Sequence, residues 1–276
     1  MAEIINLGIG APEVKLAAAL MANKKLPEEF AGEENLFICE GDWAIEKLIE
    51  AGVKVKIFLF CPEKMPVNSE KIKKMTGYAE KVCAISEKTC GKISERDGAD
   101  YCFLVAEAGR LSLKDIELKD NMTAIILDGQ EQPGNIGAIL RSLDAAGGDF
   151  AVYTNKRCKM THPRLIRSSL GAAFTLPFVY AEFDELTEWL RDNNFRALVT
   201  DLTATKSCYE QDYNGRIAIV CGNEYLGISP KWRELPITEP IIIPMLGKVE
   251  SLNVGFASTL VAYECSLRQK NIIKRC

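Results

Sequence analysis

The sequence predicts an α/β protein whose C-terminal part is a parallel-sheet domain and whose N-terminal part is a smaller α/β domain. From Thr123 onward, continuous apolar runs typical of strands buried on both faces alternate with segments of helical periodicity. Before this point, shorter apolar and helical segments alternate in a stretch rich in Lys and Glu. The length of 276 residues also favours about two domains.

The first domain is expected to contain two helices and two strands. A helix at 42–51 has Ile45, Leu48 and Ile49 on one side and ends at Gly52, a residue suited to the left-handed position after a helix. The other expected elements are a strand at 53–60 stopped by Pro62, a helix at 70–79 and a strand at 101–106.

The charged segment 114–121 has no clear periodicity, and we expect the domain boundary there, between domains 1–118 and 119–276. The alternation of strands and helices beyond it predicts a parallel sheet. The expected strands are 123–127, 150–153, 195–200, 217–221 and 240–243, and the expected helices are 136–146, 163–173, 184–193 and 252–270.

Composition excludes several classes of protein. Apolar residues make up 47% and charged residues 26%, as in globular proteins, and no run of about 18 apolar residues is present to cross a membrane. The apolar run 16–22 follows no basic segment, so no signal peptide is expected. The 10 cysteines form no CxxC pair and indicate reduced thiols, while the single histidine excludes metal sites that need two. We therefore expect a soluble, cytoplasmic protein without a metal.

Three loops rich in Gly, Asn, Ser and Pro follow three of the expected strands. Ligands of open α/β sheets bind beyond the carboxyl ends of the strands, so these loops are expected to converge on one site. In the first loop, 128–137, Asn135 is a candidate helix N-cap beside an anion-attracting helix terminus, and Arg141 suits a phosphate. Alternatively, Asn135 only caps the helix and Arg141 only forms a surface ion pair.

The second and third loops carry further polar candidates. In the second, 222–229, Glu224 comes just after a buried strand, where a carboxylate can contact a ligand; alternatively, Glu224 is solvated in a turn. In the third, 244–254, Ser251 or Asn253 is a candidate cap for the last helix.

Taken together, the three loops resemble the three motifs of the SpoU (TrmH-like) RNA 2′-O-ribose methyltransferases of the SPOUT class. The resemblance covers about residues 123–268, and the matching segments are LDGQEQPGNIGAILRSLDAAG, IVCGNEYLGIS and IIIPMLGKVESLNVGFAS. More loosely, FICEGDWAIEKLIEAG resembles the start of the small RNA-substrate-binding domain that precedes the catalytic domain in many members.

The resemblance implies a catalytic domain with a trefoil knot, S-adenosyl-L-methionine bound in the knotted loops, and a homodimer joined through the last helix, 252–270. The positions implied to contact the cofactor are Thr200, Leu202, Gly222, Asn223, Glu224, Gly227, Ile243, Met245, Ser251 and Leu252. The set implied for catalysis and RNA contact is Asn135, Arg141, Glu224, Ser251 and Asn253.

Methyl transfer from a sulfonium needs neither a metal nor a covalent enzyme intermediate, so positioning must supply most of the rate. In the family, the counterpart of Arg141 is often called the base. A guanidinium has a pKa above about 12 and hardly ever deprotonates. We therefore interpret Arg141 as a clamp on the adjacent phosphate that also stabilises the forming alkoxide.

Two positions depart from the family pattern. Tyr225 stands where the family usually has Gly, and it would be strained if that position required a positive φ. We expect its ring to pack against the protein, with stacking on an RNA base or covering of the cofactor as alternatives. Phe256 adds bulk near the dimer or cofactor face, where small or β-branched residues are commoner.

Other charged residues have weaker patterns. Arg164 and Arg167 lie one turn apart and, with Arg141, are candidates for RNA binding; alternatively they form a solvated helix face. His162 is expected in a turn before that helix. The lysines within 71–74 are expected on a solvated face because acidic residues flank them.

The sequence thus predicts an S-adenosylmethionine-dependent RNA 2′-O-ribose methyltransferase, without a DNA or membrane partner. Ribosomal RNA is favoured over transfer RNA because a separate N-terminal domain is expected. The formal net charge of −4 means that any RNA track is local. One alternative is a non-catalytic RNA-binding relative, against which the intact polar set argues. Another is a phosphate-binding α/β enzyme of a different class, without affinity for S-adenosylmethionine.

Overall fold

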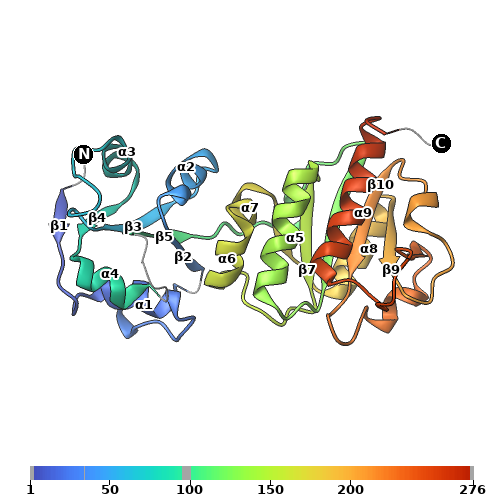
Figure 1. Cartoon of the computed structure of the whole chain (residues 1–276), viewed down its shortest axis with the longest axis horizontal. Coiled ribbons are helices and arrows are strands. Elements are labelled where there is room, and N and C mark those ends of the chain that lie inside the picture. The colour runs from blue at the N-terminus through green and yellow to red at the C-terminus, as the bar shows by residue number, and fades with distance from the viewer. Residues whose placement is uncertain (1–2, 34, 95–100, 274–276) are drawn as a thin grey trace. The chain divides into compact units, whose positions relative to one another are not determined.

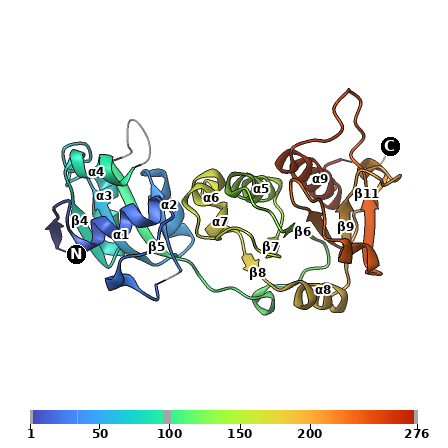
Figure 2. The same cartoon turned by 90° about the horizontal axis from the view of Figure 1, so that it is seen from below.

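The protein consists of two compact units (Figures 1 and 2). The computed structural model describes residues 3–33, 35–94 and 101–273. The first unit takes in residues 1–109 and 160–175, and the second takes in residues 110–159 and 176–276.

This division differs from the expected domain boundary in two ways. The second unit begins earlier, at Arg110, because Leu113 packs into its core. Residues 160–175, expected in the second domain, belong to the first unit, where Phe174 stacks on Phe37 with ring centroids 5.7 Å apart. The helical segment 160–175 is therefore part of the first unit, although it comes later in the sequence than the start of the second unit.

The first unit is a five-stranded mixed sheet in the order β1-β4-β3-β5-β2, in which β5 runs antiparallel to both of its neighbours. Helices α1 and α4 lie on one face and α2 and α3 on the other (Figure 1). The strands are β1 (Ile4–Asn6), β2 (Leu36–Glu40), β3 (Val55–Phe60), β4 (Lys81–Ala84) and β5 (Cys102–Glu107). The helices are α1 (Pro12–Met21), α2 (Trp43–Glu50), α3 (Glu70–Tyr78), α4 (Glu87–Ile93), α6 (Pro163–Ser169) and α7 (Ala172–Thr175).

The second unit is a six-stranded sheet in the order β11-β9-β10-β6-β7-β8, and every pair in it is parallel, as predicted. The strands are β6 (Met122–Asp128), β7 (Phe150–Thr154), β8 (Phe178–Tyr180), β9 (Phe195–Thr200), β10 (Arg216–Cys221) and β11 (Thr238–Ile241). The helices are α5 (Pro133–Ala146), α8 (Phe183–Asp192) and α9 (Val254–Gln269).

The parallel sheet is covered on both faces, which explains its continuous apolar strands. On one face, Ile126 and Val220 pack with Leu186 of α8 in a single apolar cluster. The alternate residues, such as Ile125 and Ile219, are equally buried and point to the opposite face, where α5 and α9 lie side by side (Figure 2).

Local residue chemistry explains where several elements end. Gly52 and Gly147 follow α2 and α5 with φ of 64° and 71°, which confirms both predicted helix ends. The single helix expected at 163–173 is instead split, because Leu170 and Gly171 both take positive φ between α6 and α7. Strand β11 begins two residues before the expected strand and contains Pro240, which the sheet tolerates because β11 is an edge strand.

The cysteines in the described ranges are free thiols, and all but Cys158 are buried. Burial raises the pKa of Cys221 and Cys265 to about 12, so both thiols stay protonated at neutral pH. Over the described residues, no group of three or more His, Cys, Asp or Glu side chains is placed to hold a metal ion, and no helix is long and apolar enough to span a membrane. Cys276 lies outside the described residues.

Asp128, the last residue of β6, joins three segments through hydrogen bonds. Its Oδ2 accepts from the backbone N–H of Ser229 at 2.7 Å and from Nε1 of Trp232 at 3.1 Å. Its Oδ1 accepts from Nδ2 of Asn155 at 2.6 Å. Asp128 is 3% exposed and Trp232 is fully buried, so Nε1 of Trp232 has no access to water as an alternative partner, whereas the bonds from Ser229 and Asn155 are partly buried.

We expect Asp128→Ala to lower the free energy of unfolding by about 3 kcal/mol, because it leaves the buried Nε1–H of Trp232 without an acceptor and removes two partly buried hydrogen bonds. Urea unfolding followed by far-UV circular dichroism measures this change. Asp144→Ala, on the exposed side of α5, is the matched control and should change the free energy by less than about 0.5 kcal/mol. Equal stability of the two variants would contradict this role of Asp128.

Candidate functional site at the carboxyl edge of the parallel sheet

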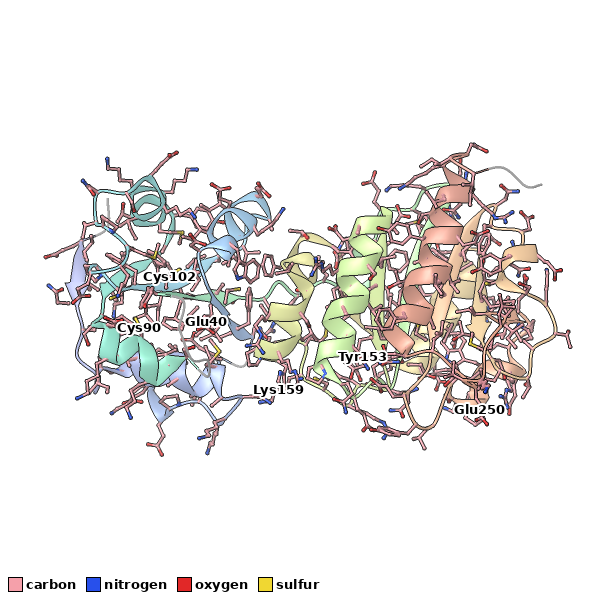
Figure 3. The ribbon with its side chains drawn as sticks, in the orientation of Figure 1. Glu40, Cys90, Cys102, Tyr153, Lys159 and Glu250 are labelled. Atoms are coloured by element: carbon pink, nitrogen blue, oxygen red, sulfur yellow. The ribbon has the colours of Figure 1, made fainter. Side chains whose placement is uncertain are left out.

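Four neighbouring strands of the second unit end at the same edge. In the register of the sheet, Thr200 lies opposite Ile241, and Cys221 lies opposite Leu127. The three polar loops therefore begin side by side, as the sequence predicted. Figure 3 shows Tyr153 near the end of β7 and Glu250 of the third loop toward this same end of the unit.

Asn135 connects the first loop to the second. Its Nδ2 donates a hydrogen bond of 2.9 Å to Oε1 of Glu224. The predicted N-cap role of Asn135 is wrong, because Gln132 is the N-cap of α5 and Pro133 takes the first helical position. Proline is favoured there because its φ suits the helix and its missing N–H is not needed. Asn135 thus sits inside the first turn with its side chain free for Glu224.

Glu224 is partly buried and held by hydrogen bonds, so the alternative, a solvated carboxylate in a turn, is wrong. Besides the bond from Asn135, its Oε2 lies 3.4 Å from the backbone N–H of Glu131, which donates to it. Glu131 in turn forms an ion pair of 2.6 Å with Arg157. An amide and a carboxylate are therefore fixed against each other at the start of α5.

Asn223 acts as a scaffold for the second loop. Its Nδ2 donates to the carbonyl of Gly129 at 2.8 Å, and its Oδ1 accepts from the backbone N–H groups of Tyr225 and Leu226 at 2.9 and 3.0 Å. Asn223 and Gly227 also exchange two backbone hydrogen bonds of 2.7 and 3.0 Å. These bonds use the amide oxygen, one N–H of Nδ2 and both backbone groups, so Asn223 holds the loop in shape.

Both glycines of this loop are required by the backbone. A Cβ on Gly222 would lie 2.3 Å from the carbonyl carbon of Gly227, a distance that no side chain can take. Gly227 has a φ of 71°, which favours glycine. These two positions explain why the loop can fold tightly enough to bring Glu224 back to Asn135.

Sequence reasoning missed Gln130 and Tyr153. Gln130 is fully buried, and its Nε2 donates to the carbonyl of Gly222. The hydroxyl of Tyr153 donates to the carbonyl of Gln130 and accepts from the N–H groups of Arg157 and Cys158 at 3.0 and 2.9 Å. Burial raises the pKa of Tyr153, which keeps this hydroxyl protonated. A polar residue directly after a buried strand was the only available signal for Gln130.

Arg141 lies apart from the Asn135–Glu224 pair. Six residues further along α5, it is displaced by about 9 Å along the helix axis and by about 240° around it. It is exposed and, within the described part of the chain, makes no hydrogen bond or ion pair. The alternative of a surface ion pair is therefore wrong, and the guanidinium is available to a ligand.

The third loop is the most open part of the edge. Asn253 caps α9, its Oδ1 accepting from the N–H of Gly255 at 2.9 Å, whereas Ser251 is exposed and does not cap. Of the described hydrogen bonds, none involves the backbone of 243–252. This stretch therefore presents unpaired backbone donors and acceptors at the edge of the sheet.

Four of the positions implied for the methyl donor, Ile243, Met245, Ser251 and Leu252, lie within this open stretch. Ile243 and Met245 are partly buried and Leu252 is 36% exposed, whereas Leu202, after β9, is 61% exposed. Thr200 is partly buried and its Oγ1 donates to the carbonyl of Val220 at 3.3 Å. Apolar side chains beside free backbone N–H and C=O groups suit a nucleoside with an aliphatic sulfonium arm.

The remaining candidates lie in the first unit. His162 is the N-cap of α6, its Nδ1 accepting from the N–H of Arg164 at 3.1 Å, which confirms the expected turn position. Arg164 is exposed and Arg167 partly buried on the same helix. Helix α6 belongs to the first unit, whereas Arg141 lies on α5 of the second. The 71–74 lysines include two in ion pairs with Asp42, Glu46 and Glu70, as expected of a solvated face.

The two departures from the family pattern have different outcomes. Tyr225 is not among the described residues with positive φ, so its backbone is unstrained. The expected packing of its ring is wrong, because 80% of Tyr225 is exposed. Phe256, in the first turn of α9, is 70% exposed.

Comparison with known proteins relates this geometry to a family. Residues 122–263 match the sequence model of the SpoU rRNA Methylase family. A 23S rRNA (uridine(2479)-2′-O)-methyltransferase of Streptomyces viridochromogenes is 30% identical over 172 residues, which are 60% of this chain and 59% of that protein. The 23S rRNA (guanosine-2′-O-)-methyltransferase RlmB of Ralstonia nicotianae is 34% identical over 175 residues, which are 61% of this chain and 69% of that protein.

Solved structures share the whole fold. The crystal structure of an RNA 2′-O ribose methyltransferase is 26% identical, with a TM-score of 0.78 over 98% of this chain and all of that one. The SpoU methyltransferase AviRb of Streptomyces viridochromogenes, solved with the cofactor AdoMet, has the same fold at 23% identity, with a TM-score of 0.82 over 95% of this chain and 99% of that one. Since the family's sequence model matches more than half of the residues, the chain belongs to the SpoU rRNA methylase family.

Proposed function

We propose that this protein transfers a methyl group from S-adenosylmethionine to a ribose 2′-hydroxyl of ribosomal RNA. The observation that carries the proposal is the hydrogen bond between Asn135 and Glu224, which joins two family motifs at the carboxyl edge beside the open backbone of 243–252. Relatives named as 23S rRNA 2′-O-methyltransferases support ribosomal RNA as the substrate. We place the protein in the cytoplasm, in keeping with its free buried thiols.

We propose that the second unit is knotted. Strand β11 pairs with β9, and its continuation, Ile242, exchanges hydrogen bonds with Lys206 and Cys208 on the far side. The chain then returns as α9, where Gln269 donates to the carbonyls of Tyr213 and Gly215 at 2.8 and 2.9 Å. A C-terminal segment enclosed in this way between 201–215 and the sheet supports a trefoil knot.

The methyl donor supplies an electrophilic methyl group, which the 2′-oxygen takes as the S–C bond breaks and the hydroxyl proton is released. We propose that the backbone of 243–252 and the apolar side chains of Leu202, Ile243, Met245 and Leu252 hold the donor, with Thr200, Gly222 and Gly227 shaping its surroundings. Asn223 is proposed to shape the donor's surroundings, because its amide and its backbone groups bond to Gly129 and to the turn 225–227.

Asn135, Glu224, Ser251 and Asn253 are proposed to orient the ribose. Since Nδ2 of Asn135 is committed to Glu224, its Oδ1 is free to accept from the ribose hydroxyl. Arg141 is proposed to grip the adjacent phosphate and to stabilise the negative charge that grows on the 2′-oxygen. Arg164 and Arg167 are proposed to add phosphate contacts from the first unit.

The function is tested with unmodified 23S rRNA transcripts and S-adenosylmethionine that carries a tritiated methyl group. We expect tritium to enter the RNA and nucleoside mass spectrometry to find one 2′-O-methylated nucleoside, with 16S rRNA and transfer RNA transcripts as controls. RNA binding without tritium transfer would instead indicate a non-catalytic relative. No affinity for S-adenosylmethionine in calorimetry would indicate a different class of enzyme.

Arg141→Lys is expected to lower kcat by about 100-fold, because a lysine cannot reproduce the planar, bidentate geometry of a guanidinium. The affinity for S-adenosylmethionine should stay within about twofold of wild type, since the residues proposed to hold the donor do not include Arg141. Arg191→Lys, on the exposed side of α8, is the matched control. Near-normal turnover by Arg141→Lys would argue against the clamp.

We propose that the protein is a homodimer joined through α9. This helix buries Val261 and Cys265 against the sheet yet leaves Phe256, Leu260 and Tyr263 exposed at spacings of four and three residues, which form one apolar strip. Exposed strips of this kind mark interaction surfaces.

Phe256→Glu is expected to weaken the dimer by about 100-fold, since it places a charge in an apolar interface. Light scattering coupled to size-exclusion chromatography, over a range of protein concentrations, measures this shift. Val67→Glu changes an exposed apolar residue of the first unit, 47% accessible, and should leave the dimer intact. A wild type that is monomeric at all concentrations would refute the interface.

A further inference from the structure

The turn at Tyr225 and Leu226 exposes two large apolar side chains beside the proposed reaction site. Tyr225 is 80% and Leu226 69% exposed, whereas the preceding strand β10 is almost wholly buried. Resting on the proposed function, we propose that Tyr225 stacks on a nucleobase of the RNA next to the methyl acceptor, and that Leu226 supports this contact. The resemblance to the family places glycine at this position in most members, so the contact would be a property of this chain.

The turn is rigid enough to present an aromatic ring in a fixed place. The Oδ1 of Asn223 holds the N–H groups of Tyr225 and Leu226 at 2.9 and 3.0 Å, and its Nδ2 is anchored on Gly129. The paired backbone bonds between Asn223 and Gly227 close the turn. Because the backbone is already ordered, stacking on Tyr225 requires little further loss of conformational freedom.

The surroundings of the ring favour a base over a phosphate. The segment 222–229 contains no Lys or Arg, and its carboxylate, Glu224, lies directly before the ring in sequence. Arg157 is paired with Glu131, whose backbone N–H donates to Glu224. A phosphate would be repelled here, whereas an uncharged base can lie on the face of a tyrosine, and every base offers such a face.

The position also agrees with the geometry of the proposed reaction. Glu224, bonded to Asn135 at 2.9 Å, immediately precedes Tyr225. A ribose held at this pair therefore has its own base or the neighbouring base within reach of the ring. Tyr225 would thus select for unpaired nucleotides, because a base inside a duplex has no free face to offer.

The test compares wild type, Tyr225→Phe, Tyr225→Ala and Tyr209→Ala. Tyr209 is the matched control: it is 48% exposed, and its carbonyl accepts from Arg268 in the last turn of α9. Binding is measured by fluorescence anisotropy with end-labelled single-stranded oligouridylate and with an abasic ribose-phosphate oligomer of equal length, over a range of salt concentrations. Oligomeric state is measured for each variant by light scattering.

We expect Tyr225→Ala to weaken oligouridylate binding by about 10- to 100-fold. Tyr225→Phe and Tyr209→Ala should bind within about twofold of wild type. The abasic oligomer should bind wild type and Tyr225→Ala equally. The slope of log K against log salt should be unchanged in Tyr225→Ala, because stacking releases no counterions. On 23S rRNA, Tyr225→Ala should raise KM with kcat and S-adenosylmethionine affinity nearly unchanged.

Equal binding of oligouridylate by wild type and Tyr225→Ala would overturn the proposal, as would a smaller salt slope, which would indicate a phosphate contact. Loss of the dimer in Tyr225→Ala would assign the ring to a second copy of the chain instead. A wild type that methylates no RNA would refute the proposed function, and the binding comparison would still decide separately whether Tyr225 stacks on bases.

Discussion

Hydrogen bonds between two loops, one after β6 and one after β10, hold the candidate site together. Buried carbonyl groups need donors, and here side chains provide them: Asn223 reaches Gly129, and Gln130 reaches Gly222. These two bonds run in opposite directions between loops that follow adjacent parallel strands. Each loop therefore helps to hold the other in its conformation. With the two loops joined in this way, Asn135 also bonds to Glu224.

The close approach of Gly222 to Gly227 is a steric requirement of the same loop. Any side chain on Gly222 would collide with the backbone of Gly227, so the turn depends on the absence of one. With the backbone so placed, Tyr225 sits at the tip of the turn without a positive φ. The start of the loop is buried and hydrogen-bonded, whereas its tip is exposed. This arrangement suits a rigid loop that holds a ligand.

The parallel sheet and α9 connect this site to the rest of the unit. Asp128, at the end of β6, accepts hydrogen bonds from Ser229 and Trp232. The first loop is therefore anchored at its start by these bonds as well as by those to the second loop. Helix α9 starts at the Asn253 cap and ends where Gln269 binds carbonyls near the start of β6. One helix thus covers the sheet from its carboxyl edge to its amino edge.

The residue pattern alone determined the second unit well, because buried parallel strands are continuous apolar runs that few other structures produce. The strand at 195–200 and the helix ends at Gly52 and Gly147 followed from local sequence, since short-range sterics decide them. Local sequence also identified the three loops and the family that they resemble. Short elements such as β1, β4 and β8 were not predicted, because segments of three or four residues have no measurable period.

Only the tertiary structure decided which polar groups meet. Asn135 is predicted as a cap when its neighbours in sequence alone are considered, but Glu224, 89 residues later, takes its amide. Gln130 and Tyr153 show no motif, and their importance lies in long-range bonds across the sheet. The placement of residues 160–175 with the first unit is likewise a matter of packing between segments far apart in the chain. Local sequence sets backbone preferences, whereas burial and hydrogen-bond partners depend on contacts that only the folded chain creates.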